Sequence, residues 1–136
     1  MNLFCFGLGY SAETLAQEYG DQKYGDHFHA ISGTVRTLDK ANRLRRRGIH
    51  AIALDDNTSQ LQIKAALATI DCLLVSAAPD DAGDPMLRQF KRVLESASQL
   101  KIIIYLSTIG VYGDHNGAWI DETTPLNATR DRKSVV

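Results

Sequence analysis

The most constraining feature of the chain is a set of small residues near its amino terminus. Residues 4–12 read FCFGLGYSA, an apolar run in which Gly7, Gly9 and Ala12 form the pattern G-x-G-x-x-A before a helical stretch at 13–19. Gly7 permits a tight turn out of a strand, Gly9 leaves room for a pyrophosphate, and Ala12 lets the helix pack closely on a sheet. An ordinary tight turn can carry the same glycines, but this strand-to-helix context predicts a dinucleotide site at the helix N-terminus.

The rest of the chain alternates apolar strands with amphipathic helices. Strands are predicted at residues 2–6, 28–32, 49–54, 71–76 and 101–106, helices at 11–19, 38–48, 60–69 and from Pro85 onward, and a polar loop at 20–26. Continuously apolar strands are typical of a parallel sheet covered on both faces by helices. The predicted fold class is therefore α/β, a Rossmann doubly wound parallel sheet with strand order 3-2-1-4-5. Its ligand crevice is expected at the carboxyl ends of the first and fourth strands.

Length and charge narrow the class of protein. A chain of 136 residues with a net charge of −1 is expected to form one domain and not to bind nucleic acid. The arginines at 43 and 45–47 are interpreted as the solvated face of the second helix. No apolar stretch approaches membrane-spanning length and no signal peptide is visible, so we expect a cytoplasmic protein with no membrane partner.

The two cysteines, Cys5 and Cys72, both fall within predicted apolar strands. This placement indicates buried, reduced thiols and no disulfide framework. The chain contains no C-x-x-C motif, and no metal site is expected.

The segment after the second predicted strand bears on the choice of cofactor. A carboxylate there would bind the ribose 2′-hydroxyl of NAD, whereas an arginine accommodates the 2′-phosphate of NADP. The chain has Arg36 in this segment and no acid before Asp39. Arg36 can bind a phosphate through two parallel hydrogen bonds, and Thr34 or Thr37 can add a hydroxyl. The pattern therefore favours NADP over NAD, with Arg43 as a second cation for the phosphate and a solvated Arg36 as the alternative.

Two further loops are expected at the same crevice. Asp55, after the third strand, is placed either to accept a hydrogen bond from the adenine amino group or to form a helix-capping turn. Ala77, Ala78 and Pro79 follow the fourth strand, where small residues let the backbone approach a ribose and nicotinamide. A simple loop start would have the same composition.

The fifth predicted strand ends in a second motif. Residues 106–113 read LSTIGVYG, and an Asp-Glu pair at 121–122 and Pro125 follow. Together with the glycine pattern and strand order, this segment resembles the short-chain dehydrogenase/reductase superfamily, in its extended and atypical branch of NAD-dependent epimerases and dehydratases. The resemblance runs from Gly7 to Pro125. It implies that Thr108, next to Ser107, is the catalytic hydroxyl that hydrogen-bonds the substrate during hydride transfer. Without the resemblance, the two hydroxyl residues would be interpreted as the ordinary end of a strand.

The resemblance, together with the loops above, defines a set of candidate cofactor-binding residues. They are Gly7, Gly9, Tyr10, Ser11, Ala12, Thr34, Arg36, Asp55, Ala77, Ala78 and Pro79.

The chain also departs from that family. The family's acid/base tyrosine lies in a Y-x-x-x-K motif, but residues 127–136 contain Lys133 with Thr129 in the place of the tyrosine. Relatives continue through a sixth strand and a smaller carboxyl-terminal lobe that forms the substrate pocket. We therefore expect a Rossmann domain at residues 1–126 and a polar tail at 127–136. Truncation is favoured over a natural minimal module, and the fifth strand would form an unpaired edge prone to self-association.

Two functions stay open at this point. One is an NADP-binding domain of an atypical short-chain oxidoreductase or epimerase acting on an unknown small molecule. The other is a non-catalytic module that senses NADP(H). A third, nucleic-acid binding by the arginine helix, is disfavoured by the near-zero net charge.

Overall fold

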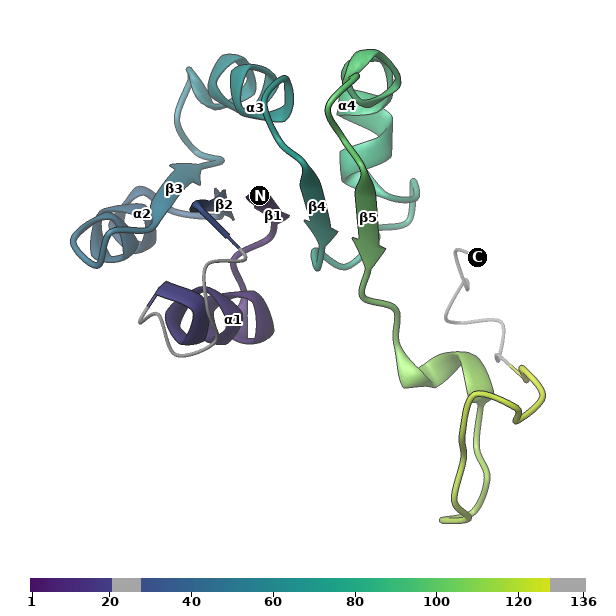
Figure 1. The fold of residues 1–136 in the computed structure, drawn as a ribbon. Helices are drawn as coiled ribbons and strands as arrows, with labels where there is room; N and C mark the ends of the chain where they lie inside the picture. The colour runs from purple at the N-terminus through teal and green to yellow at the C-terminus, as the bar shows by residue number, and fades with distance from the viewer. Residues whose placement is uncertain (21–27, 128–136) are drawn as a thin grey trace. The chain divides into compact units, whose positions relative to one another are not determined.

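The computed structural model describes residues 1–20 and 28–127 (Figure 1). In chain order the elements are β1 (Asn2–Phe6), α1 (Tyr10–Gly20), β2 (Ala30–Val35), α2 (Leu38–Arg45), β3 (His50–Ala53), α3 (Ser59–Leu67), β4 (Cys72–Val75), α4 (Pro85–Ser96), β5 (Ile102–Tyr105) and the 3₁₀ helix η1 (Ile109–Tyr112). The chain divides into a first unit, residues 1–106, and a second unit, residues 107–136. The loop predicted at 20–26 falls, after Gly20, outside the described residues.

The first unit is built on one parallel sheet. Its five strands lie in the order β3-β2-β1-β4-β5, and every neighbouring pair is parallel. This confirms the predicted doubly wound α/β fold and its strand order. β1 and β4 are adjacent at the point where the strand order reverses, so the loops after these two strands leave the sheet side by side.

The alternating side chains of β1 point into two separate cores. Leu3 and Cys5 pack in a core with the buried residues of α1 and α2, whereas Phe4 and Phe6 pack in a core with those of α3 and α4. This follows from the two-residue period of a strand. Helices therefore cover both faces of the central strands, as a doubly wound sheet requires (Figure 1).

The second strand lies later in the chain than predicted. The sequence predicts this strand at residues 28–32, but β2 spans Ala30–Val35. Its pairing with β3 continues to its last residue, where Val35 lies opposite Ala53. Gly33 pairs with Cys5, and a Cβ at Gly33 would lie 2.3 Å from the Cys5 carbonyl oxygen. The glycine thus permits the close approach of two strands and does not begin a loop.

β5 is the edge of the sheet and differs from the other strands in burial. Its side chains are 37–58% exposed, although all four are large and apolar or aromatic. The continuously apolar sequence predicts cover on both faces. In the part of the chain that the structure describes, β5 pairs only with β4, and the buried residues of α4, Met86 and Phe90, pack in the core beneath β1 and β4.

The second unit contains η1 and a series of turns. Thr108 caps η1 by accepting a hydrogen bond from the Gly110 N–H through its hydroxyl, at 3.1 Å. The Asn127 N–H donates to the Val111 carbonyl at 3.0 Å, which brings the last described residue back to η1.

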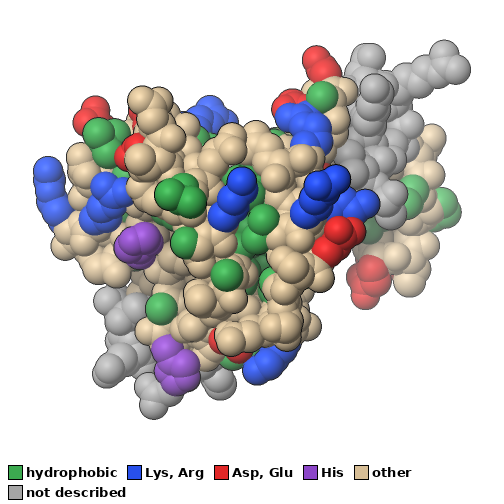
Figure 2. Space-filling view, turned by 90° about the horizontal axis from the view of Figure 1, so that it is seen from above, with side chains coloured by type: hydrophobic (Ala, Val, Ile, Leu, Met, Phe, Trp, Pro, Cys, Tyr) green, Lys and Arg blue, Asp and Glu red, His purple; other side chains and the backbone are tan. Residues whose placement is uncertain are grey.

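Charged side chains of both signs are interspersed on the face of the molecule shown in Figure 2. None of the helices within 1–20 and 28–127 combines the length and apolar character that a membrane span requires.

Candidate functional site

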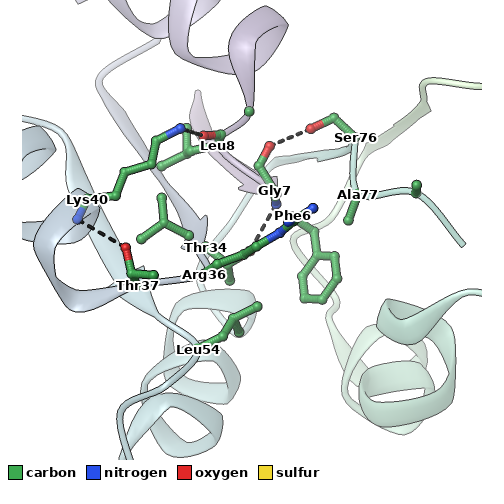
Figure 3. Close-up of a pocket in the computed structure, with 13 residues that line it drawn as sticks. Phe6, Gly7, Leu8, Thr34, Arg36, Thr37, Lys40, Leu54, Ser76 and Ala77 are labelled. Atoms are coloured by element: carbon green, nitrogen blue, oxygen red, sulfur yellow. Dashed lines mark hydrogen bonds between the residues drawn. The ribbon is translucent and has the colours of Figure 1, made fainter. Parts of the chain in front are cut away.

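The first unit contains a pocket of about 600 Å³ at the carboxyl ends of the strands. It lies at the ends of β1, β2, β3 and β4, the place where open α/β sheets bind ligands (Figure 3). Its lining residues are Phe6, Gly7, Leu8, Gly9, Thr34, Val35, Arg36, Thr37, Lys40, Leu54, Ser76, Ala77 and Ala78.

The loop between β1 and α1 is fixed by hydrogen bonds to its neighbours. Gly7 has a φ of +98°, and its N–H donates to the Thr34 hydroxyl at 2.9 Å. The Gly7 carbonyl accepts from the Ser76 hydroxyl, and the Leu8 N–H donates to the Thr34 carbonyl at 2.7 Å. A Cβ at Gly7 would lie 3.0 Å from the Ala77 nitrogen. Gly7 therefore meets both the conformational and the steric demand of this turn.

The start of α1 presents donors without partners. Within the described residues, the N–H groups of Gly9, Tyr10, Ser11 and Ala12 have no hydrogen-bond acceptor, and the Glu13 N–H is the first to donate, to the Gly9 carbonyl at 2.8 Å. A Cβ at Gly9 would meet no atom within 4 Å, so the space beside this backbone is open. Free N–H groups and the positive end of the helix dipole suit an anion at this position.

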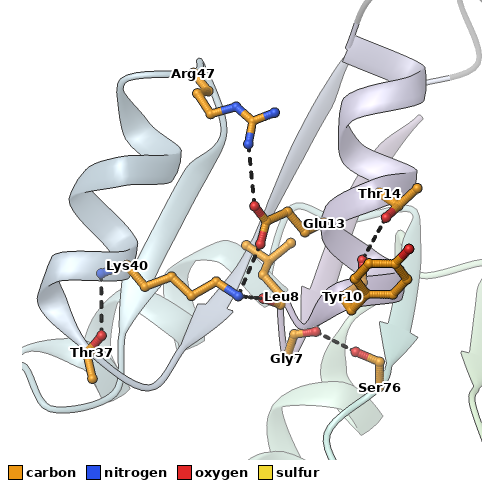
Figure 4. A network of polar contacts seen from close by, with 9 residues as sticks. All are labelled: Gly7, Leu8, Tyr10, Glu13, Thr14, Thr37, Lys40, Arg47 and Ser76. Atoms are coloured by element: carbon orange, nitrogen blue, oxygen red, sulfur yellow. Dashed lines mark hydrogen bonds and ion pairs between the residues drawn. The ribbon is translucent and has the colours of Figure 1, made fainter.

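Two cations line the same pocket. Arg36 follows β2, is exposed and has no ion pair or hydrogen bond to any described residue. Lys40, in α2, donates from Nζ to the Leu8 carbonyl at 2.7 Å and pairs with Glu13 at 3.1 Å (Figure 4). Glu13 also pairs with Arg47 at 3.4 Å. The pocket therefore combines free backbone donors with a net positive charge.

The structure brings together most of the predicted cofactor-binding residues. Those that line the pocket are Gly7, Gly9, Thr34, Arg36, Ala77 and Ala78. Ala12 is fully buried in the core beneath α1, as expected of a residue that lets the helix pack on the sheet.

Besides Ala12, four predicted residues lie outside the pocket lining. They are Tyr10, Ser11, Asp55 and Pro79. Tyr10 is 89% exposed, and its backbone N–H is one of the free donors at the start of α1. Asp55 accepts a hydrogen bond of 3.4 Å from the Leu38 N–H at the start of α2. The carboxylate of Asp55 thus caps α2, a helix that precedes it in the sequence.

Thr34 has a structural contact that the sequence did not predict. Its side chain is 1% exposed and its hydroxyl accepts a hydrogen bond from the Gly7 N–H, so it supports the glycine loop; its contact with a phosphate stays a prediction. Thr37, the other predicted hydroxyl, caps α2 by accepting from the Lys40 N–H at 3.4 Å. Arg43 is exposed and is not part of the pocket lining.

Ser107 and Thr108 belong to the second unit. Both are exposed, and the Thr108 hydroxyl is the cap of η1 described above. Their catalytic role stays a prediction from the family resemblance.

Sequence reasoning missed Lys40, and it placed Ser76 in the loop after the fourth strand without assigning its hydroxyl a contact. The hydroxyl of Ser76 binds the Gly7 carbonyl, and the ammonium of Lys40 binds the Leu8 carbonyl. The signal for Lys40 was its position four residues after Arg36, since the first turn of a helix that follows a strand lies at the carboxyl edge of the sheet.

Burial strongly affects the thiol of Cys5, two residues before Gly7. Burial, with a smaller contribution from Cys72, raises its pKa from 9.0 to about 12, so the thiol is uncharged at neutral pH. Both cysteines are buried and free. No group of three or more His, Cys, Asp or Glu side chains is placed to hold a metal ion within the ranges that the structure describes.

The fold and pocket together define a Rossmann-like α/β domain, and comparison with solved structures supports that class. A functionally unknown conserved protein from Silicibacter pomeroyi DSS is 36% identical with a TM-score of 0.72, and the match covers 94% of this chain and 43% of that one. The structure of gox2253 is 20% identical with a TM-score of 0.58, over 93% of this chain and 40% of that one. The chain thus spans about two-fifths of the length of these proteins. No protein-family model and no curated protein matches the chain.

Proposed function

We propose that the pocket binds a nicotinamide dinucleotide, with NADP preferred over NAD. The observation that carries this proposal is the row of four unpartnered N–H groups from Gly9 to Ala12, beside a pocket that also contains Arg36 and Lys40. Four donors at a helix N-terminus match the oxygens of a pyrophosphate, and the open space at Gly9 lets that group approach the backbone.

The remaining lining residues fit the other parts of such a ligand. Arg36 lies beyond the end of β2, where a 2′-phosphate on the adenosine ribose is bound in this fold. Ala77 and Ala78 follow β4 and present small side chains to the nicotinamide end. The bound cofactor would supply a hydride donor or acceptor, while this chain binds and orients it.

We further propose that the chain is the cofactor domain of an oxidoreductase of the short-chain dehydrogenase/reductase type. The support is the resemblance of the glycine loop and of the segment LSTIGVYG to that family. In this proposal Thr108 hydrogen-bonds the reacting oxygen of the substrate.

The role of Arg36 is tested by titrating the protein with NADPH and with NADH and following nicotinamide fluorescence. Arg36→Met keeps most of the aliphatic stem and removes the charge. Loss of charge-assisted hydrogen bonds to a phosphate should weaken NADPH binding by about 10- to 100-fold. NADH binding should change little, because NADH lacks the 2′-phosphate.

The control variant is Arg92→Met, which removes an exposed cation from α4, outside the pocket lining. It should bind both cofactors as the wild type does. Equal losses of NADPH and NADH affinity in Arg36→Met would contradict a role in cofactor discrimination.

A second candidate function is cofactor binding without catalysis. The observation that favours it is the sequence after Thr108, where Tyr112 is the only tyrosine and Asn116 stands four residues later, so that this chain carries no Tyr-x-x-x-Lys there. NADPH oxidation should be assayed with a panel of aldehydes and ketones. Turnover that is lost in Thr108→Val supports the enzyme, whereas tight binding without turnover supports the sensing module.

A further inference from the structure

The peptide between Leu8 and Gly9 is held in a different way from the rest of the glycine loop. Gly7 and the Leu8 N–H are fixed by groups on β2 and just after β4. The Leu8 carbonyl is bound by Lys40 Nζ, at 2.7 Å, from α2 (Figure 4). Within the described residues, this charged side chain is the one hydrogen-bond donor to the Leu8 carbonyl.

The geometry of the peptide makes this contact important for Gly9. A trans peptide is planar, and its C=O and N–H groups point in opposite directions. When Lys40 holds the Leu8 carbonyl, the Gly9 N–H on the same peptide points away from Lys40. That N–H is one of the four free donors. If the peptide rotated, a carbonyl oxygen would take its place and repel an anion, and glycine offers little resistance to such a rotation.

Lys40 is itself held in place by an acid. Glu13 pairs with Lys40 at 3.1 Å and with Arg47 at 3.4 Å, and the Glu13 side chain is only 17% exposed. Glu13 lies in the first turn of α1, directly after the free donors at the start of that helix. The trio of Glu13, Lys40 and Arg47 thus links α1 to α2 and carries a net charge of +1.

We propose that Lys40, anchored by Glu13, is a positioning residue that aims the Gly9 N–H at the pyrophosphate of the cofactor. This inference rests on the proposed function. It implies that Glu13 strengthens the binding of NADPH through Lys40, although the negative charge of Glu13 alone would weaken the binding of an anion.

The sign of the effect of Glu13→Ala separates positioning from simple attraction. If Lys40 acts only through its charge, removal of a neighbouring carboxylate strengthens the binding of an anion. If Lys40 acts by holding the Leu8 carbonyl, loss of its anchor weakens binding. We expect the NADPH Kd to rise by about threefold to tenfold in Glu13→Ala and by about tenfold or more in Lys40→Met. An unchanged or lower Kd in Glu13→Ala would overturn the proposal.

A second measurement uses the ligand-free protein, so that it is independent of the proposed function. The carbonyl ¹³C resonance of Leu8 reports its hydrogen bond directly. It should move upfield in Lys40→Met and stay in place in Lys91→Met, a control that removes an exposed cation of α4 that pairs with Glu95 at 3.9 Å. An unmoved Leu8 resonance in Lys40→Met would overturn the positioning role. If the wild type bound no NADPH while the Leu8 resonance responded as expected, the proposed function would be wrong. The orientation of the Leu8–Gly9 peptide by Lys40 would still be supported.

Discussion

The hydroxyl of Thr34 accepts a 2.9 Å hydrogen bond from the backbone N–H of Gly7, a residue 27 positions earlier in the chain. The carbonyl of Thr34 also accepts the Leu8 N–H, at 2.7 Å. One buried residue of β2 therefore binds the glycine loop at two consecutive peptide groups. Both bonds are made within the chain itself, so they hold the loop in one conformation and reduce the conformational entropy that binding an anion would cost.

Thr34→Val tests this relationship. The variant keeps the shape of the side chain but leaves the partly buried Gly7 N–H without its acceptor. An unsatisfied group of this kind lowers the free energy of unfolding by about 1–3 kcal/mol. Urea denaturation measures the loss. Thr34→Ser retains the hydroxyl and should recover most of the stability, whereas equal stability of Thr34→Val and wild type would show that the bond is not formed in solution.

Two glycine-to-alanine substitutions should have opposite consequences. At Gly9 the new methyl group meets no atom within 4 Å, so the free energy of unfolding should change by less than about 1 kcal/mol. In the proposed complex the methyl group would occupy the space through which the pyrophosphate reaches the backbone, so NADPH affinity should fall by about tenfold or more, a difference of about 1.4 kcal/mol. Circular dichroism and a fluorescence titration measure the two effects.

Gly33→Ala is the matched contrast. Its methyl group would lie 2.3 Å from the Cys5 carbonyl, and the two strands can accommodate it only by moving apart. This variant should unfold at lower temperature or fail to fold. A well-folded Gly33→Ala would contradict the register of β1 and β2. For the other variant, normal NADPH binding by Gly9→Ala would contradict the proposed position of the pyrophosphate.

The order of the sheet was predictable from sequence because its signals are local. The apolar strands, the helical periodicity and the G-x-G-x-x-A pattern each occupy a short stretch, and the topology of doubly wound sheets then determines strand order. The site residues on the loops after β1 and β4 could be located for the same reason. Both loops leave the sheet where the strand order reverses.

The features that could not be predicted depend on contacts between distant segments. Gly33 resembled the start of a loop, and only its pairing with Cys5 shows that the strand continues. Thr34 was predicted as a ligand for a phosphate, and the hydrogen bond that its hydroxyl accepts from Gly7 could not be predicted because the two residues are far apart in the chain. Lys40 was assigned no role, because its contact with Leu8 depends on the packing of α1 against α2 through Glu13.

The thiol of Cys5 predicts a dependence of stability on alkaline pH. Its pKa is raised from 9.0 to about 12 in the folded protein, mainly by burial. A raised pKa means that the folded state binds the proton more tightly than the unfolded state. This stabilisation is complete below about pH 9 and is lost as the pH rises through 12.

Urea denaturation between pH 8 and pH 11 should therefore show a decline in wild-type stability that is smaller in Cys5→Ala.

At neutral pH both cysteines should react with a thiol reagent only after unfolding. Rapid labelling of the folded protein would contradict the burial of β1 and β4.

The edge strand predicts self-association between copies of this chain. Ile103 is 58% exposed in the middle of β5, and neighbouring apolar side chains are exposed as well. An exposed apolar edge is a template for pairing with another strand. In sedimentation velocity the apparent mass of the wild type should rise with concentration, and Ile103→Lys should stay monomeric. Leu61→Lys, which alters an apolar side chain 73% exposed on α3, is the control and should associate like the wild type. A wild type that stays monomeric at all concentrations would contradict this use of the edge.

The central claim, that the pocket at the carboxyl ends of the strands binds a dinucleotide, is tested most directly by titrating the ¹⁵N-labelled protein with NADPH and mapping the amide resonances. The account predicts saturable shifts concentrated at the free amides of residues 9–12, at Arg36 and at Ala77 and Ala78. Shifts centred elsewhere, or none at saturating NADPH, would contradict it.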